Sequence, residues 1–138
     1  MKASRNVKLF TAILLIGLSA GIFAKGPKTE KSFQEKYIKG AEYALGNDLP
    51  SVVESSIFVS MEIKDRFPAQ KYDHLINKLE NLARDGQTVS IRYKAGLAVI
   101  YFNYYDLFKE IKIDSRENPD QYFKSITNKI ENNFFALN

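Results

Sequence analysis

Apolar residues recur every three or four positions through most of the chain beyond residue 32, which is the spacing of one face of an α-helix. This periodicity predicts five helices. Because the spacing stays helical throughout this part of the chain, the fold class that it predicts is all-α. The predicted helices cover about residues 33–46, 52–66, 70–85, 89–109 and 119–136.

Residues that favour helix ends mark several of these boundaries. Ser32 and Ser51 are each followed three residues later by a glutamate, which is the capping-box pattern of a helix N-terminus. Asn118 precedes a proline, and proline is tolerated at the first helical position because its missing N–H group needs no partner there. Gly46 and Gly86 are typical of helix ends.

The predicted helix 89–109 differs from the others because it is apolar on two sides. One stripe of apolar residues consists of Ile91, Ala95, Ala98 and Phe102. A second stripe on the opposite side consists of Tyr93, Leu97, Ile100, Tyr104 and Phe108. A helix that is apolar on both sides needs neighbours on both sides. We therefore expect this helix to be the central element of the domain.

The helices also show an internal repeat. A shift of 38 residues places the first two predicted helices over the next two with the apolar register kept. Within segment 85–98, an acidic residue in the turn is followed by the apolar–arginine pair Ile91-Arg92 and then by small residues. This segment resembles the turn and second helix of a HEAT-type repeat. The first unit departs from that pattern, because Glu54 stands where the arginine is expected.

The resemblance implies a fold of stacked antiparallel helical hairpins, a HEAT-like α-solenoid fragment of about two and a half units in residues 32–138. It also implies binding of a protein or a peptide along the face formed by the second helices. Two other architectures fit the helix pattern. Tetratricopeptide-type hairpins are one, although a 38-residue period fits their repeat of about 34 residues less well. The other is a helical bundle without repeats.

The N-terminal segment has the three-part pattern of a secretory signal. Lys2, Arg5 and Lys8 precede an uncharged run from Leu9 to Ala24, which ends in small residues. The sequence predicts a signal peptide over residues 1–24 and a flexible leader over 25–31, with cleavage after Ala24 or, as a second option, after Ala20. An exported chain in the periplasm or outside the cell is expected. The alternative is a chain anchored in the membrane by the uncleaved segment, which is then its only membrane contact.

The net charge of +4 arises mostly from this same segment, since it holds three of the 20 basic residues and none of the 16 acidic ones. The remainder has 17 basic groups against 16 acidic groups, a balance of +1. Nucleic-acid binding normally requires a large basic excess, so we expect no nucleic-acid partner. The chain has no cysteine, and packing alone must therefore stabilise the exported domain.

Residues with catalytic or metal-binding chemistry are scarce. His74 is the only histidine, and it lies opposite the apolar stripe of its predicted helix, which favours a surface position. One histidine without cysteine cannot supply the usual ligands of a zinc site. We therefore predict no enzymatic activity, no metal and no cofactor.

The function that the sequence favours is a non-enzymatic protein- or peptide-binding or scaffolding module. The candidate partner-binding residues are Tyr101, Tyr105, Glu62, Arg66 and Phe135. The two tyrosines are expected at an edge of the central helix, where aromatic groups commonly contribute to recognition. The alternative is a structural helical bundle of the cell envelope that associates with copies of itself through the helix 119–136. An enzyme or a small-ligand carrier is the third hypothesis.

Overall fold

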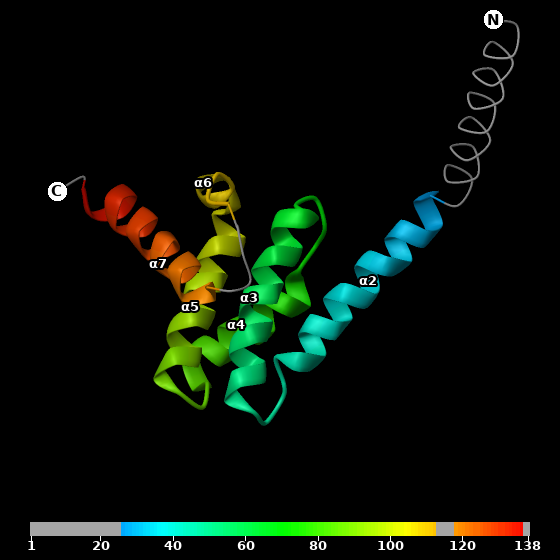
Figure 1. Cartoon of the computed structure of the whole chain (residues 1–138), viewed down its shortest axis with the longest axis horizontal. Helices are drawn as coiled ribbons and strands as arrows, with labels where there is room; N and C mark the ends of the chain where they lie inside the picture. The colour runs from blue at the N-terminus through cyan, green and yellow to red at the C-terminus, as the bar shows by residue number, and fades with distance from the viewer. Residues whose placement is uncertain (1–25, 113–117, 137–138) are drawn as a thin grey trace, which may run out of the picture. The chain divides into compact units, whose positions relative to one another are not determined.

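A computed structural model describes residues 26–112 and 118–136, so the predicted signal segment lies outside the described residues. The described residues form helices and short connections without any strand, which confirms the all-α prediction. The elements in chain order (Figure 1) are α2 (Gly26–Ala44), α3 (Pro50–Arg66), α4 (Asp73–Asp85), α5 (Val89–Asn103), α6 (Tyr105–Phe108), α7 (Pro119–Ile130) and the π-helical turn η1 (Glu131–Phe135).

Helix α2 begins at Gly26, seven residues before the predicted start, so the expectation of an N-cap at Ser32 is wrong. Described residues of the predicted flexible leader are part of this helix. The chain forms two compact units, and their boundary falls within α2, between Lys36 and Tyr37. Among the residues that the structure describes, no helix combines the length and the apolar character needed to cross a lipid bilayer.

The starts of the later helices follow local hydrogen bonding. Thr88 caps α5 by accepting a hydrogen bond from the Ile91 N–H (3.1 Å), and Asn118 caps α7 as predicted. Helix α3 begins at Pro50, with Leu49 as its N-cap, so the predicted cap at Ser51 is wrong. The ring of Pro50 suits the first helical position because it lacks an N–H group and fixes φ at a helical value.

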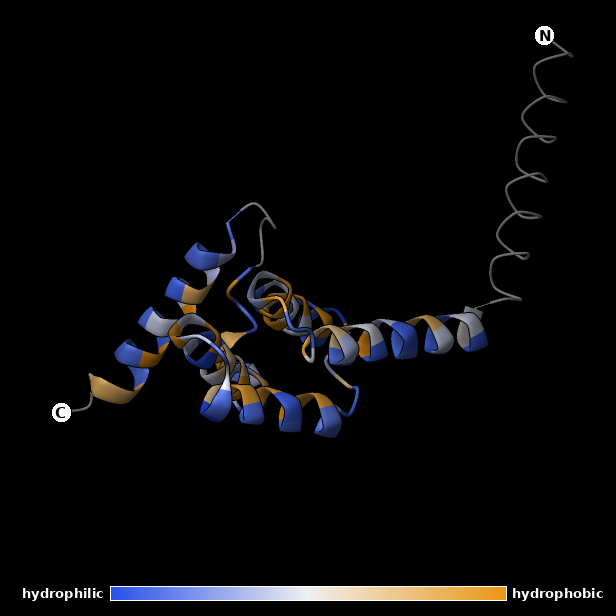
Figure 2. Ribbon diagram, turned by 90° about the horizontal axis from the view of Figure 1, so that it is seen from below, coloured by the Kyte–Doolittle hydropathy of each residue, from blue (hydrophilic) through white to orange (hydrophobic). Residues whose placement is uncertain are grey.

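Helix α5 contacts α3, α4, α6 and α7, as expected of the central element (Figure 1). The stripe of apolar residues that begins with Ile91 is buried along its whole length, as predicted. Figure 2 shows apolar residues between the helices and hydrophilic residues on their outward sides. In the second stripe, Leu97 and Phe108 are buried, but Tyr93 is 50% exposed and Tyr104 is 56% exposed. The prediction that α5 is covered on both sides is therefore wrong at these two tyrosines.

The predicted helix 89–109 is interrupted at Tyr104, whose backbone (φ −122°, ψ 39°) ends α5 before α6 begins. This break explains the exposure of Tyr104, because its side chain no longer follows the stripe of the preceding turns. The predicted helix 119–136 also changes character: α7 ends at Ile130 and continues as the π-helical turn η1. In this turn the side-chain amide of Asn133 donates a hydrogen bond to the backbone carbonyl of Lys129 (2.7 Å).

Gly86 lies where α4 and α5 approach each other. A Cβ atom at this position would lie 2.5 Å from the Leu82 carbonyl oxygen and 2.7 Å from Cγ2 of Ile91. The Arg92 guanidinium also donates a hydrogen bond to the Gly86 carbonyl oxygen (2.7 Å). This position therefore needs glycine because there is too little space for a Cβ atom. The backbone is not the reason, since any residue can adopt its φ of −56°.

We expect Gly86→Ala to lower the free energy of unfolding by about 1–3 kcal/mol, because the methyl group forces α4 and α5 apart. Urea denaturation followed by circular dichroism measures this change. Gly96→Ala in α5 is the matched control, since nothing lies within 4 Å of its added Cβ. That variant should gain up to about 1 kcal/mol from the better helix propensity of alanine. Equal stability of the two variants would contradict the packing explanation.

Candidate functional site

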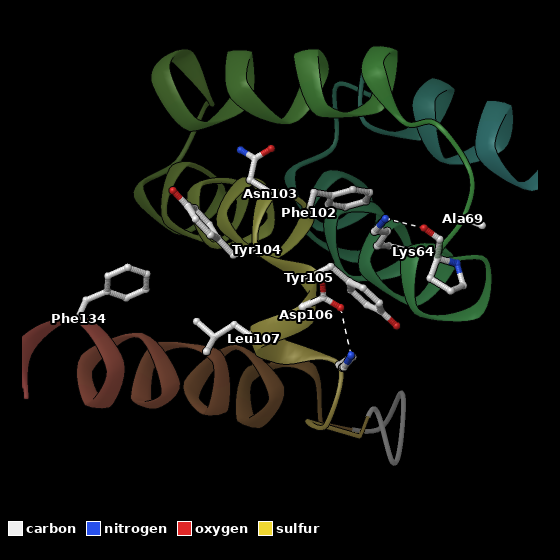
Figure 3. Close-up of a pocket in the computed structure, with 11 residues that line it drawn as sticks. Lys64, Ala69, Phe102, Asn103, Tyr104, Tyr105, Asp106, Leu107 and Phe134 are labelled. Carbon is white, nitrogen blue, oxygen red and sulfur yellow. Dashed lines mark hydrogen bonds and ion pairs between the residues drawn. The ribbon is translucent and has the colours of Figure 1, made fainter.

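An open groove of about 1110 Å³ lies among the end of α3, the connection that follows it, the α5–α6 break and η1 (Figure 3). Its lining is mainly aromatic and apolar. We call it the aromatic groove and define it by Lys64, Phe102, Tyr104, Tyr105, Leu107 and Phe134. The elements that form it are far apart in the sequence, and helix packing brings them together.

Tyr104 and Phe134 form one end of the aromatic groove (Figure 3). Their ring centroids are 6.1 Å apart and the ring planes meet at 73°, which is an edge-to-face contact. Tyr104 projects because α5 ends there, and Phe134 projects from the π-helical turn. About half of each side chain is exposed, so both aromatic groups can contribute further buried area to a bound partner.

Lys64 lies at the other end of the aromatic groove (Figure 3). Its ammonium group donates a hydrogen bond to the Pro68 carbonyl (2.8 Å) and lies 5.3 Å and 5.1 Å from the ring centroids of Tyr72 and Tyr105. These contacts hold the cation between two aromatic faces. Partial burial lowers the pKa of Lys64, and the charge of Asp106 partly offsets this effect.

The connection between α3 and α4 is held in place by Tyr72. Its hydroxyl donates a hydrogen bond to the Phe67 carbonyl (2.7 Å) and lies 3.2 Å from the Ile63 carbonyl oxygen. Burial raises the pKa of Tyr72 to about 12, with a smaller contribution from Tyr105. Tyr72 therefore ties the connection to the end of α3 and presents one ring face to Lys64.

The charges of the aromatic groove are unevenly paired. Asp106 and Lys109 form an ion pair with each other (3.1 Å). Within residues 26–112 and 118–136, Lys64 makes no ion pair, and its hydrogen bond goes to a neutral carbonyl. The groove therefore holds one half-buried cation whose charge no carboxylate balances directly.

Tyr101 is fully buried, so the prediction that it lies at an edge available to a partner is wrong. Its ring packs against those of Phe102, Tyr105, Phe108 and Tyr122, because α6 and α7 cover this side of α5. Among the described residues, the hydroxyl groups of Tyr101 and Tyr122 make no hydrogen bond of normal geometry. Burial raises the pKa of both tyrosines well above the ordinary value.

The other predicted partner-binding residues lie apart from one another. Tyr105 is half-buried and lines the aromatic groove, where it also donates a hydrogen bond to Asp65 (3.0 Å). Burial and this hydrogen bond raise the pKa of Tyr105 to about 12. Glu62 and Arg66 line a separate small hollow on α3, of about 10 Å³. Phe135 is 66% exposed, beside the groove residue Phe134 but outside the lining.

Of the six residues that define the aromatic groove, only Tyr105 is among the partner-binding residues predicted from the sequence. Phe102 and Tyr104 are predicted in the apolar stripes of the central helix, and the predicted binding set does not include Lys64, Leu107 or Phe134. The adjacency of Phe134 to Phe135 is the one signal that could have indicated it. Lys64 gave none, because its place depends on how the connection after α3 folds back.

A second groove, of about 570 Å³, lies between α2 and α3 and is lined mostly by small residues such as Gly40, Ala41 and Ser55. It contains no acidic or basic side chain. His74 is exposed, as predicted. In the part of the chain that the structure describes, no three or more His, Cys, Asp or Glu side chains are grouped so that they could hold a metal ion.

Comparison of the chain with protein-family models, with curated proteins and with solved structures found no match. The candidate site is therefore defined by its own geometry.

Proposed function

We propose that this chain is a non-enzymatic module that binds a protein or a peptide in the aromatic groove. The observation that carries this proposal is the pair of half-exposed aromatic side chains, Tyr104 and Phe134, at one end of an open groove. Aromatic residues contribute a large share of binding energy at interfaces because they bury a large area at a small entropic cost. An open groove with an apolar wall suits a partner segment that lies across the surface.

The architecture that we propose for this module is the HEAT-like arrangement of helical hairpins. The bounds of the central helices support it, since a shift of 38 residues moves the bounds of α3 to 88 and 104, within one residue of those of α5. We also propose that residues 1–24 direct the chain out of the cytoplasm, which would place the binding module in the periplasm or outside the cell.

The binding proposal is tested by selecting peptides on the full chain, in a mild detergent, from a phage-displayed library of random dodecapeptides. We expect Tyr104→Ala and Phe134→Ala each to weaken binding of the selected peptides about tenfold, because a central aromatic contact contributes about 1.4 kcal/mol or more. Fluorescence anisotropy of labelled synthetic peptides measures the affinity. Tyr43→Ala is the matched control, since Tyr43 is 82% exposed and lies outside the groove. Failure to select any peptide, or equal binding by all variants, would refute the proposal.

A second candidate function is self-association through the C-terminal segment. The exposure of Phe135, which points a large apolar side chain into solvent just beyond the groove, favours it. In this function, Phe135 would be buried against a second copy of the chain, and the copies would form a structural assembly of the cell envelope. Sedimentation equilibrium that gave a strict monomer at high protein concentration would exclude this function and leave the peptide-binding proposal intact.

A further inference from the structure

We propose that the partner of the aromatic groove is an acidic peptide segment, in which a carboxylate binds Lys64 and a neighbouring aromatic or aliphatic side chain packs against Tyr104 and Phe134. This inference rests on the proposed binding function and adds the chemistry of the partner. It assigns to Lys64 the role of an anion-binding residue.

Lys64 carries a charge that no ion pair with a described residue balances. Lys64 is half-buried, and its ammonium group contacts a neutral carbonyl and two aromatic faces rather than a carboxylate. Partial burial has removed hydration from this cation, and the charge of Asp106 offsets that loss only in part. A carboxylate from a partner would supply that interaction, and the fixed position of the ammonium group means that little side-chain entropy is lost on binding.

The lining of the groove contains more basic than acidic side chains. Asp106 is its one acidic lining residue; it forms an ion pair with Lys109 and also acts on Lys64 through its charge. The lining therefore carries two cations, Lys64 and Lys109, against one carboxylate. A basic segment would meet Lys64 with the wrong sign of charge, whereas an acidic segment is complementary to it. The charges of the groove therefore favour a partner segment with negative charge.

The cation and the exposed aromatic pair are separated along the groove. Lys64 and the Tyr104–Phe134 pair lie at opposite ends of the groove, with Phe102 and Leu107 among the residues between them (Figure 3). A peptide that crosses the groove would place its carboxylate and its apolar side chain at different positions along its length. A fatty acid also joins a carboxylate to an apolar group, but long aliphatic chains bind in enclosed cavities, whereas this groove is open and its aromatic wall is half exposed.

The experiment compares paired peptides on the full chain in a mild detergent. Each peptide selected from the dodecapeptide library is synthesised with its acidic residues and with glutamine in their place. On the unmodified chain we expect the acidic form to bind about fivefold more tightly, as a half-buried ion pair would give. Lys64→Met, which keeps an unbranched apolar side chain, should reduce this ratio to about one. Lys64→Arg should preserve it.

Lys71→Met is the matched control, because Lys71 is exposed outside the groove lining and its loss changes the net charge equally. It should leave the ratio unchanged. Thermal unfolding of each variant establishes that the helical fold is retained.

The outcomes separate this inference from the proposed function. If Tyr104→Ala abolishes binding but glutamine peptides bind as tightly as acidic ones, the acidic-peptide inference is wrong and the binding function stands. The same holds if Lys64→Met keeps the fivefold ratio. If no peptide is selected, both are wrong. If decanoate displaces every selected peptide and binds in preference to them, the occupant is a lipid rather than a peptide, and the inference is overturned.

Discussion

Raising the pH above about 10 is expected to unfold this protein in a steep transition, because buried tyrosines ionise readily only in the unfolded chain. Tyr72, Tyr101 and Tyr122 are at least nine-tenths buried, and burial raises the pKa of each. A raised pKa means that the folded state keeps protons that the unfolded state loses above its ordinary value of about 10. Stability is therefore fully present below about pH 10 and falls as the pH rises further.

The expected size of this effect is large for a small domain. Each buried tyrosine should cost roughly 1 kcal/mol of stability between about pH 10 and about pH 11, so three of them cost about 3 kcal/mol. The whole stability of such a domain is about 5–15 kcal/mol. Circular dichroism followed against pH, together with tyrosinate absorbance, measures both processes. The loss of helix and the ionisation of these tyrosines should coincide.

The double variant Tyr101→Phe/Tyr122→Phe is the control for the alkaline transition. Its transition should move to higher pH, because two of the linked groups are removed. At neutral pH it should be at least as stable as the parent chain, since the hydroxyl groups that it removes are buried without a normal hydrogen bond among the described residues. Ionisation of all eight tyrosines near pH 10 with the helices intact would show that the burial explanation is wrong.

Lys94→Ala is expected to lower the free energy of unfolding by about 2–3 kcal/mol. Lys94 of α5 joins three helices. Its ammonium nitrogen lies 2.7 Å from a carboxylate oxygen of Glu54 in α3 and 2.8 Å from one of Asp120 in α7. It also lies 5.5 Å from the ring centroid of Phe123 in α7. Burial lowers the pKa of Lys94, but hydrogen bonds and attraction from Asp120 and Glu54 outweigh burial and raise it.

The loss comes mainly from Glu54, because its side chain is only 28% exposed and its carboxylate would be left without its cation. Asp120 is 81% exposed, so water can replace most of its contribution. Urea denaturation measures the change. Lys109→Ala, which breaks the exposed pair with Asp106, is the control and should cost less than about 1 kcal/mol. Similar losses in the two variants would mean that the position of Lys94 between three helices has no special effect.

The helices could be predicted from the sequence because their signals are local. The apolar spacing of α3, α4 and α5 and the stop at Gly86 depend on residues within a few turns of each other. They predicted the bounds of α3 and α4 closely, and the start of α5 but not its end. The capping-box patterns at Ser32 and Ser51 did not mark the starts of α2 and α3. At Ser51 a nearby signal prevailed, because Pro50 fixes the first helical position.

The candidate site could be predicted only in part because it depends on packing between distant segments. The apolar spacing continues through Tyr104, and nothing near it in the sequence indicates that α5 ends there. The local sequence also does not indicate which side of α5 is covered by α7. Tyr101 is buried and Tyr104 is exposed, the reverse of the expectation, because this packing involves a distant segment. Tyr105 was identified correctly as a residue near the surface, since it belongs to the segment that leaves the central helix.

The π-helical turn at the end of α7 means that the position of Phe134 depends on how many residues precede it as well as on its own identity. A π-turn accommodates one more residue than an α-turn, so it shifts the angular position of everything after it by roughly one residue's rotation. If this segment were a regular α-helix, Asn133 rather than Phe134 would point in about the direction that Phe134 takes now. The backbone form of this turn therefore determines which of these two neighbouring side chains lines the groove, without any change of residue type.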